Sequence, residues 1–316
     1  MVERHWGIDE RRHLSFGRGA ALIAIVDPSS PASGASWLYL TDEPERGLGP
    51  VLVWADRHHS SPVHVLVEAA APLLARQAEH FSSPEVSVWQ IDGDELVSAP
   101  PAALAEPARS KPAPELVDLL IDAGLEIVVD DGIVRGEVNG LEVARIGDGT
   151  LEVGVGAADR ELTAMLHGDL APTEQLTRAV AMVRELRRPD APVHPLNQLV
   201  PERWLRTVLC RNPGLIGLRT LRSATTPTPR RGLREPDTAV ALGESPDGQP
   251  VVVACSVGVD VDLVPRAADH RAGLNPEAQL WLVVPERDNH PTTQRLAANL
   301  REAALIVTVP DNWRDL

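Results

Sequence analysis

Lysine is almost absent from this chain of 316 residues: it occurs once, as Lys111, within a proline-rich segment. A phosphate-binding P-loop, a Schiff base on a strand and a lysine general base in a core each need an ordered amine. The sequence therefore predicts that none of these lysine-dependent chemistries operates in the protein.

Cysteine is nearly as scarce, since Cys210 and Cys255 are the whole supply. Both lie in apolar stretches, where a thiol usually serves as a small buried hydrophobe, and two cysteines exclude a disulfide framework. The sequence also has no Cys-x-x-Cys, His-Glu-x-x-His or Gly-x-Ser-x-Gly motif. Structural zinc, zincin and hydrolase-elbow chemistry therefore have no support.

Long apolar runs are missing too: none reaches 18 residues, and no apolar stretch of signal-peptide length follows the N-terminus. We therefore expect a soluble protein of the cytoplasm, with no membrane partner. The 45 acidic and 30 basic residues give a formal charge of −15, which repels phosphate backbones and argues against broad nucleic-acid binding. The seven tryptophans are scattered along the chain and form no stacking series of the kind that single strands require.

The length and the 43% hydrophobic content are typical of about two domains, each with its own core. A Pro/Ala-rich segment has no apolar periodicity and is predicted to be a linker. The predicted division is an N-terminal α/β domain at 1–97, the linker at 98–113 and a C-terminal α/β domain at 114–316. A Pro/Arg-rich stretch at 223–236 is predicted to be an exposed loop inside the second domain.

Apolar spacing and turn residues predict the elements of each domain. In the first domain we expect strands at 20–26, 37–40 and 50–54, a helix at 63–81 kinked at Pro72, and a strand at 85–91. In the second we expect a helix at 114–124 and hairpin strands at 125–129, 133–146 (broken at Asn139-Gly140) and 151–155. Two helices follow, at 174–188 and 201–210. After the loop, strands at 251–261, 280–284 and 305–309 alternate with helices at 264–274 and 292–304. This alternation favours parallel pairing of the strands. The predicted fold class is α/β (mixed α+β), with a mixed sheet in the larger domain.

Two glutamates flank a hairpin turn in the second domain. Glu142 and Glu152 lie on either side of Gly147-Asp148-Gly149, and pairing across the turn would bring their carboxylates close, as a divalent metal needs. With Asp159 they form the predicted metal site, for magnesium or manganese. Asp159 can equally cap the helix that follows it.

Residues 125–190 resemble the PD-(D/E)XK nuclease fold on these motifs. The resemblance implies that Glu142 stands for the first acid and Glu152 for the Glu of the Glu-x-Lys strand, with the Gln-x-x-Arg-like helix motif at 174–178. Gly154 departs from the pattern, because it replaces the lysine that positions and activates the attacking water. If the fold is shared, ordinary metal-dependent cleavage therefore lacks a required group.

Two further sites are candidates. Asp260 and Asp262 share one face of a predicted strand end, where α/β proteins often bind ligands, although they can also cap the next helix. Arg203, Trp204 and Arg206 combine arginine with an aromatic side chain, which is typical of interface hot spots; a buried Trp204 with solvated arginines fits equally well.

No catalytic set is complete, so the first hypothesis is a non-catalytic or catalytically degenerate binding or regulatory protein. Its expected partner is another protein or a second copy of itself. The rival hypothesis is a metal-dependent, nuclease-like hydrolase that uses the clustered carboxylates.

Overall fold

The computed structural model describes residues 1–6, 11–24, 34–104, 112–130, 132–167, 170–191, 194–225, 232–234 and 237–316. Helices and three sheets make it a mixed α/β protein, which confirms the predicted fold class. The chain divides into two compact units. We call them the N-terminal unit (Met1–Leu104, Val261–Ala272 and His290–Leu305) and the C-terminal unit (Ala105–Asp260, Gly273–Asn289 and Ile306–Leu316). Lys111 and parts of the predicted linker and loop lie outside the described residues.

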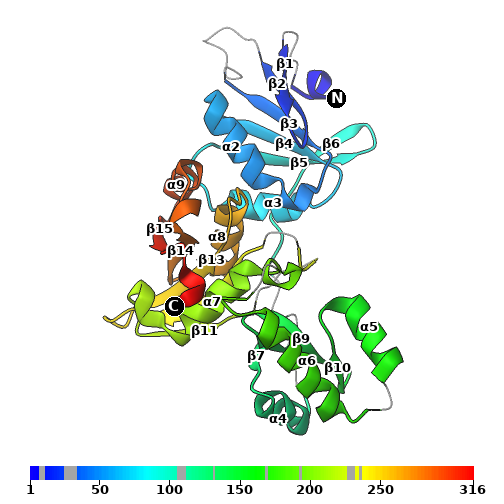
Figure 1. Cartoon of the computed structure of the whole chain (residues 1–316). Helices are drawn as coiled ribbons and strands as arrows, with labels where there is room; N and C mark the ends of the chain where they lie inside the picture. Colours follow the sequence, from blue (N-terminus) through cyan, green and yellow to red (C-terminus); the bar gives the residue numbers. More distant parts are fainter. Residues whose placement is uncertain are drawn as a thin grey trace. The chain divides into compact units, whose positions relative to one another are not determined.

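A six-stranded sheet forms the frame of the N-terminal unit (Figure 1). Its three central strands pair in parallel, and the outer pairings are antiparallel. In order across the sheet the strands are β1 (Arg11–Phe16), β2 (Gly19–Ala24), β3 (Ser36–Leu40), β4 (Val63–Val67), β5 (Val86–Asp92) and β6 (Glu95–Ser98). The short helix α1 (Val2–Trp6) precedes them, and β1 and β6 were not predicted.

Two predictions in this unit are wrong. The segment 50–54 is not a strand but part of helix α2 (Leu48–His58), because Val51, Leu52, Trp54 and Ala55 together line one buried helical face. A short apolar run has no periodicity that separates a strand from a buried helix.

The predicted helix at 63–81 is in fact two elements, strand β4 followed by helix α3 (Ala71–Ala78). The β-branched residues of Val63–Val67 favour the strand, which fills the place between β3 and β5. Pro72 lies in the first turn of α3, where proline needs no hydrogen-bond partner, so it begins the helix instead of kinking it.

In the C-terminal unit, an antiparallel four-stranded sheet follows the predicted hairpin pattern closely. Its order is β10 (Thr150–Val153), β9 (Leu141–Gly147), β8 (Ile133–Val138) and β7 (Glu126–Asp130). At the β8–β9 turn both Asn139 and Gly140 have positive φ, as predicted, and a side chain at Gly140 would meet the backbone of Arg203 at 2.4 Å. The helices are α4 (Pro114–Asp122), α5 (Gly156–His167) and α6 (Pro172–Leu186).

The third sheet has five strands. In order they are β11 (Thr220–Ser223), β12 (Ala239–Glu244), β13 (Pro250–Cys255), β14 (Gln279–Pro285) and β15 (Ala304–Val309). The predicted parallel pairing is confirmed for β13 and β14, whereas β11 and β12 form an unpredicted antiparallel extension. Helix α7 (Pro201–Arg211) packs against β11, β12 and β13. Helices α8 (Leu263–Leu274) and α9 (Pro291–Ala298) confirm the last two predicted helices.

Among the described residues, no helix combines the length and the apolar character that crossing a membrane requires.

Candidate functional site

The four-stranded sheet has one apolar face and one charged face. Helices α4 and α6 pack against the sheet through a core that includes Leu120, Val134, Ile146 and Val180. The other face, here called the charged face, carries carboxylates and arginines from four strands and two helices. Its members are Glu126, Arg135, Glu137, Glu142, Arg145, Glu152, Arg160, Arg203, Arg206 and Arg211. Four of the sequence-predicted site residues, Glu142, Glu152, Arg203 and Arg206, therefore meet on one sheet.

Glu137 holds helix α7 to this face. Its side chain is 0% exposed and accepts hydrogen bonds from Arg203 Nη1 at 2.9 Å and from Arg206 Nη2 at 3.0 Å. Both arginines come from one face of α7. On the neighbouring strand, Glu126 binds Thr207 and Arg211 of the same helix. The two predicted interaction arginines are thus committed to internal ion pairs.

Trp204 projects from α7 into the core and is 2% exposed. Its ring meets that of Trp313 edge to face with centroids 6.0 Å apart, and the guanidinium of Arg187 lies 4.7 Å from its centroid. Burial lowers the pKa of Arg187 to about 9. We therefore assign Arg203, Trp204 and Arg206 to the packing of α7 against the sheets.

The guanidinium of Arg160 lies between the two predicted metal ligands. Glu142 Oε1 is 2.8 Å from Arg160 Nη1, and Glu152 Oε2 is 3.3 Å from Arg160 Nε. Glu142 also binds Arg135, and Glu152 accepts a 2.7 Å bond from Arg145. The carboxylates converge, as predicted, but on an arginine cation.

Their approach has a different cause from the one predicted. Across the turn, Glu152 pairs with Arg145 and not with Glu142, whose cross-strand partner is Glu137 on β8. A register shift between Gly136 and Glu137 adjusts the pairing of β8 with β9. Arg160 on α5 then reaches both carboxylates, which the sequence spacing did not indicate.

Asp159 and Gly154 have local roles at the start of α5. Asp159 lies inside the first turn of α5 and accepts a 2.6 Å hydrogen bond from the backbone N–H of Val155, so it stabilises the helix start but does not occupy the N-cap position predicted as the alternative. Gly154 has a φ of 141°, and a Cβ placed there would lie 2.7 Å from the backbone nitrogen of Arg160. A lysine at position 154 would therefore clash with the helix that carries Arg160.

The donor set does not fit a divalent ion. Within the part of the chain that the structure describes, no three His, Cys, Asp or Glu side chains gather as metal ligands. The oxygens of Glu142 and Glu152 are already neutralised by guanidinium groups, which would have to leave before an ion could bind. Binding of magnesium or manganese at Glu142, Glu152 and Asp159 stays a prediction from sequence alone.

Asp262 is engaged at the start of α2. It accepts a 3.0 Å hydrogen bond from the backbone N–H of Gly49, and its other oxygen lies 4.0 Å from Arg46 Nε. An acidic oxygen at a helix N-terminus is stabilised by the free N–H groups there. Asp260 is buried, at 9% exposure.

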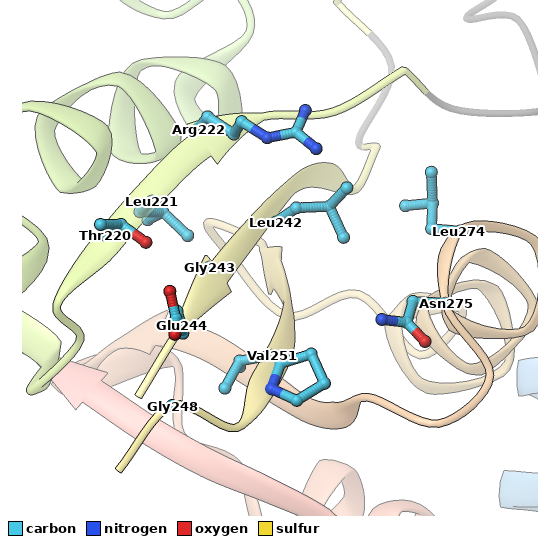
Figure 2. A pocket seen from close by; sticks show the side chains of 11 residues that line it. Thr220, Leu221, Arg222, Leu242, Gly243, Glu244, Gly248, Val251, Leu274 and Asn275 are labelled. Atoms are coloured by element: carbon cyan, nitrogen blue, oxygen red, sulfur yellow. The ribbon is translucent and has the colours of Figure 1, made fainter. Parts of the chain in front are cut away.

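A pocket of about 510 Å³ opens on the five-stranded sheet (Figure 2). Residues of β11 and β12, among them Arg222, Leu242 and Glu244, line it together with Leu274 and Asn275. Arg219 pairs with Glu244. Among the described residues that line this pocket, no nucleophilic side chain is paired with a base.

The tryptophans are scattered along the sequence, but the fold of the N-terminal unit brings three of them together. Trp6, Trp37 and Trp89 gather with His5 and His64 on one face of the six-stranded sheet, with ring centroids 4.4 to 6.3 Å apart. Trp37 and His64 are cross-strand partners in the sheet. The sequence signal for this cluster is that alternate residues of a strand, here 37–40, 63–67 and 85–91, lie on the same face of a sheet. This signal reveals the cluster only when the order of the strands in the sheet is known.

We predict that His64 makes the protein less stable in mild acid. Burial, with a smaller effect from nearby His5, lowers the pKa of His64 from 6.5 to about 4, and Nδ1 accepts a hydrogen bond from Trp89 Nε1 at 3.4 Å. Because the unfolded chain takes up this proton first, stability falls as pH drops from 6.5 toward 4. Urea denaturation across this range should show a shallower pH dependence in His64→Gln than in wild type. The exposed His58→Gln is the control, and a slope unchanged in His64→Gln would contradict the assignment.

Comparison with known proteins found no matching family model, no matching curated protein and no matching solved structure. The resemblance to the PD-(D/E)XK fold therefore stays a prediction, and the function has to be argued from this chain's own residues.

Proposed function

We propose that the protein is a non-catalytic binding protein of the cytoplasm that associates with a second copy of itself through strand β15. The observation that carries the proposal is that β15 is an apolar, uncharged strand at the edge of its sheet (Figure 1). The ion pairs of the charged face agree with a non-catalytic role, because they occupy the carboxylates that a nuclease-like hydrolase would need.

An exposed edge strand leaves a row of backbone N–H and C=O groups open to another strand, and proteins usually block it with charges, prolines or bulges. Five of the six edge strands of the described sheets follow this rule, since each carries at least one charged residue: β1, β6, β7, β10 and β11. Strand β15, Ala-Leu-Ile-Val-Thr-Val, is the exception. It has no charge, proline or glycine to prevent pairing.

The side chains of β15 support the same conclusion. Leu305 is 52% exposed and Thr308 is exposed, whereas Val309 is buried in the core beneath α7. The strand is therefore anchored at its end and open along its edge. Its β-branched and aliphatic residues are those that gain most from pairing in a sheet.

A second copy is the occupant that the sequence of β15 favours. A two-fold axis pairs a strand antiparallel with itself, and an uncharged strand can do so without bringing like charges together. The net charge of −15 repels the two copies at long range, so self-association should strengthen as salt screens that charge.

The test introduces a charge at the edge. Leu305→Lys and Thr308→Lys should each convert a dimer into a monomer, because a lysine on an edge strand opposes pairing. The measurement is sedimentation equilibrium at high micromolar concentration in low and high salt, with circular dichroism to establish folding. Val97→Lys is the matched control, because Val97 is 49% exposed on β6, an edge strand of the six-stranded sheet.

A wild-type protein that stays monomeric in both salt conditions would overturn the proposal. So would a Val97→Lys variant that dissociates as fully as the β15 variants. A dimer that none of these substitutions affects would place self-association elsewhere and reject β15 as the interface.

A further inference from the structure

In the N-terminal unit, the face of the six-stranded sheet that carries Trp37 contains a pocket of about 500 Å³. Much of its wall comes from one face of neighbouring strands: Ala20 and Leu22 on β2 pair with Tyr39 and Trp37 on β3, and Tyr39 pairs with Leu66 on β4. Met1, Val2 and His13 also line it. The walls are therefore mainly apolar and aromatic. The volume suits a ligand the size of a small organic molecule.

One carboxylate serves this pocket. Glu68 follows β4 directly and lies in the pocket lining, where its Oε1 accepts a 2.5 Å hydrogen bond from the hydroxyl of Tyr39. Gln90 donates to the Glu68 backbone carbonyl at 2.6 Å and fixes the turn that carries this side chain. Among the described residues no arginine or histidine forms an ion pair with Glu68. Its negative charge is therefore available to a ligand.

Aromatic rings add to the attraction for a positive charge. Trp37 and Tyr39 line the same pocket, and the face of an aromatic ring attracts an organic cation through its quadrupole. The hydrogen bond to the Glu68 carboxylate also raises the pKa of the Tyr39 hydroxyl.

We propose that this pocket binds a small organic ammonium ion with an apolar body, with the ammonium group at Glu68 and the body against Leu22, Trp37 and Leu66. The carboxylate selects the charge and the apolar walls select the body. The proposal is independent of self-association through β15.

Phenethylammonium is the probe, and the neutral 2-phenylethanol and the anionic 3-phenylpropionate are its matched comparisons. In calorimetric titration of the full chain, the cation should bind at least about tenfold more tightly than the alcohol, and the anion should bind most weakly. Glu68→Gln should remove the preference for the cation and leave the affinity for the alcohol unchanged.

Glu85→Gln is the control variant, since Glu85 is an exposed carboxylate outside the pocket lining. Because Glu68 is exposed, its substitution leaves the core intact, and circular dichroism would verify this. The proposal fails if the cation shows no saturable binding at millimolar concentration, if Glu68→Gln retains the full preference, or if the anion binds as tightly as the cation.

Discussion

Replacing Glu137 by glutamine should lower the free energy of unfolding by about 3 kcal/mol or more. The Glu137 carboxylate is fully buried and is the shared partner of Arg203 and Arg206, whose side chains are 13% and 4% exposed. Glutamine has nearly the same shape but no charge, so it would remove the buried negative charge that the two guanidinium groups share. Urea denaturation followed by tryptophan fluorescence would measure the loss.

An exposed ion pair in the same unit gives the matched control. Glu174 and Arg178 are 2.6 Å apart on α6, but their side chains are 49% and 63% exposed, so water already solvates both charges. Glu174→Gln should change the free energy of unfolding by no more than about 0.5 kcal/mol. If Glu137→Gln proves as mild as this control, the charged face contributes little to holding α7 in place.

Local signals in the sequence were sufficient for much of the fold. The hairpin turn at Asn139-Gly140 and the helix start at Pro201 depend on residues that are adjacent in the chain, and both were predicted. The segment 50–54 was predicted wrongly because its apolar residues suit either a strand or a buried helix. Only packing decides such cases, since Val51 and Leu52 reach complete burial from a helix.

The candidate site shows the same limit. That Glu142 and Glu152 lie on neighbouring strands was predictable, because the turn between them joins those strands. Their common partner was not, because Arg160 reaches them from a different element, α5. Without that guanidinium, two close carboxylates suggest a metal site; with it, they form an ion-pair network.

Tryptophans show how strand order creates a cluster that composition conceals. Trp37 and Trp89 are 52 positions apart in the sequence, yet both lie on the same face of strands that flank β4. The pocket beside them depends on that order too, so it was not accessible to sequence analysis. Fold class was therefore easier to predict than either candidate site.

Truncating Trp313 to alanine should lower the free energy of unfolding by about 4 kcal/mol. Trp313 is 0% exposed and belongs to the core between α7 and the five-stranded sheet, where its ring packs edge to face against Trp204. Removing the indole would leave a cavity in this core and deprive Trp204 of its aromatic neighbour. Chemical denaturation would measure the effect, with the 44% exposed Leu316→Ala as a control expected to stay within about 0.5 kcal/mol.

Phenylalanine at the same position separates the bulk of the indole from the aromatic contact with Trp204. Among the described residues, the Trp313 indole N–H has no hydrogen-bond acceptor, so Trp313→Phe gives up ring volume but no hydrogen bond. It should therefore lose less than half of what Trp313→Ala loses. Equal losses in the two variants would mean that the bulk of the indole, and not an aromatic contact with Trp204, sets the stability of this core. A loss below about 1 kcal/mol in Trp313→Ala would contradict the burial of this side chain altogether.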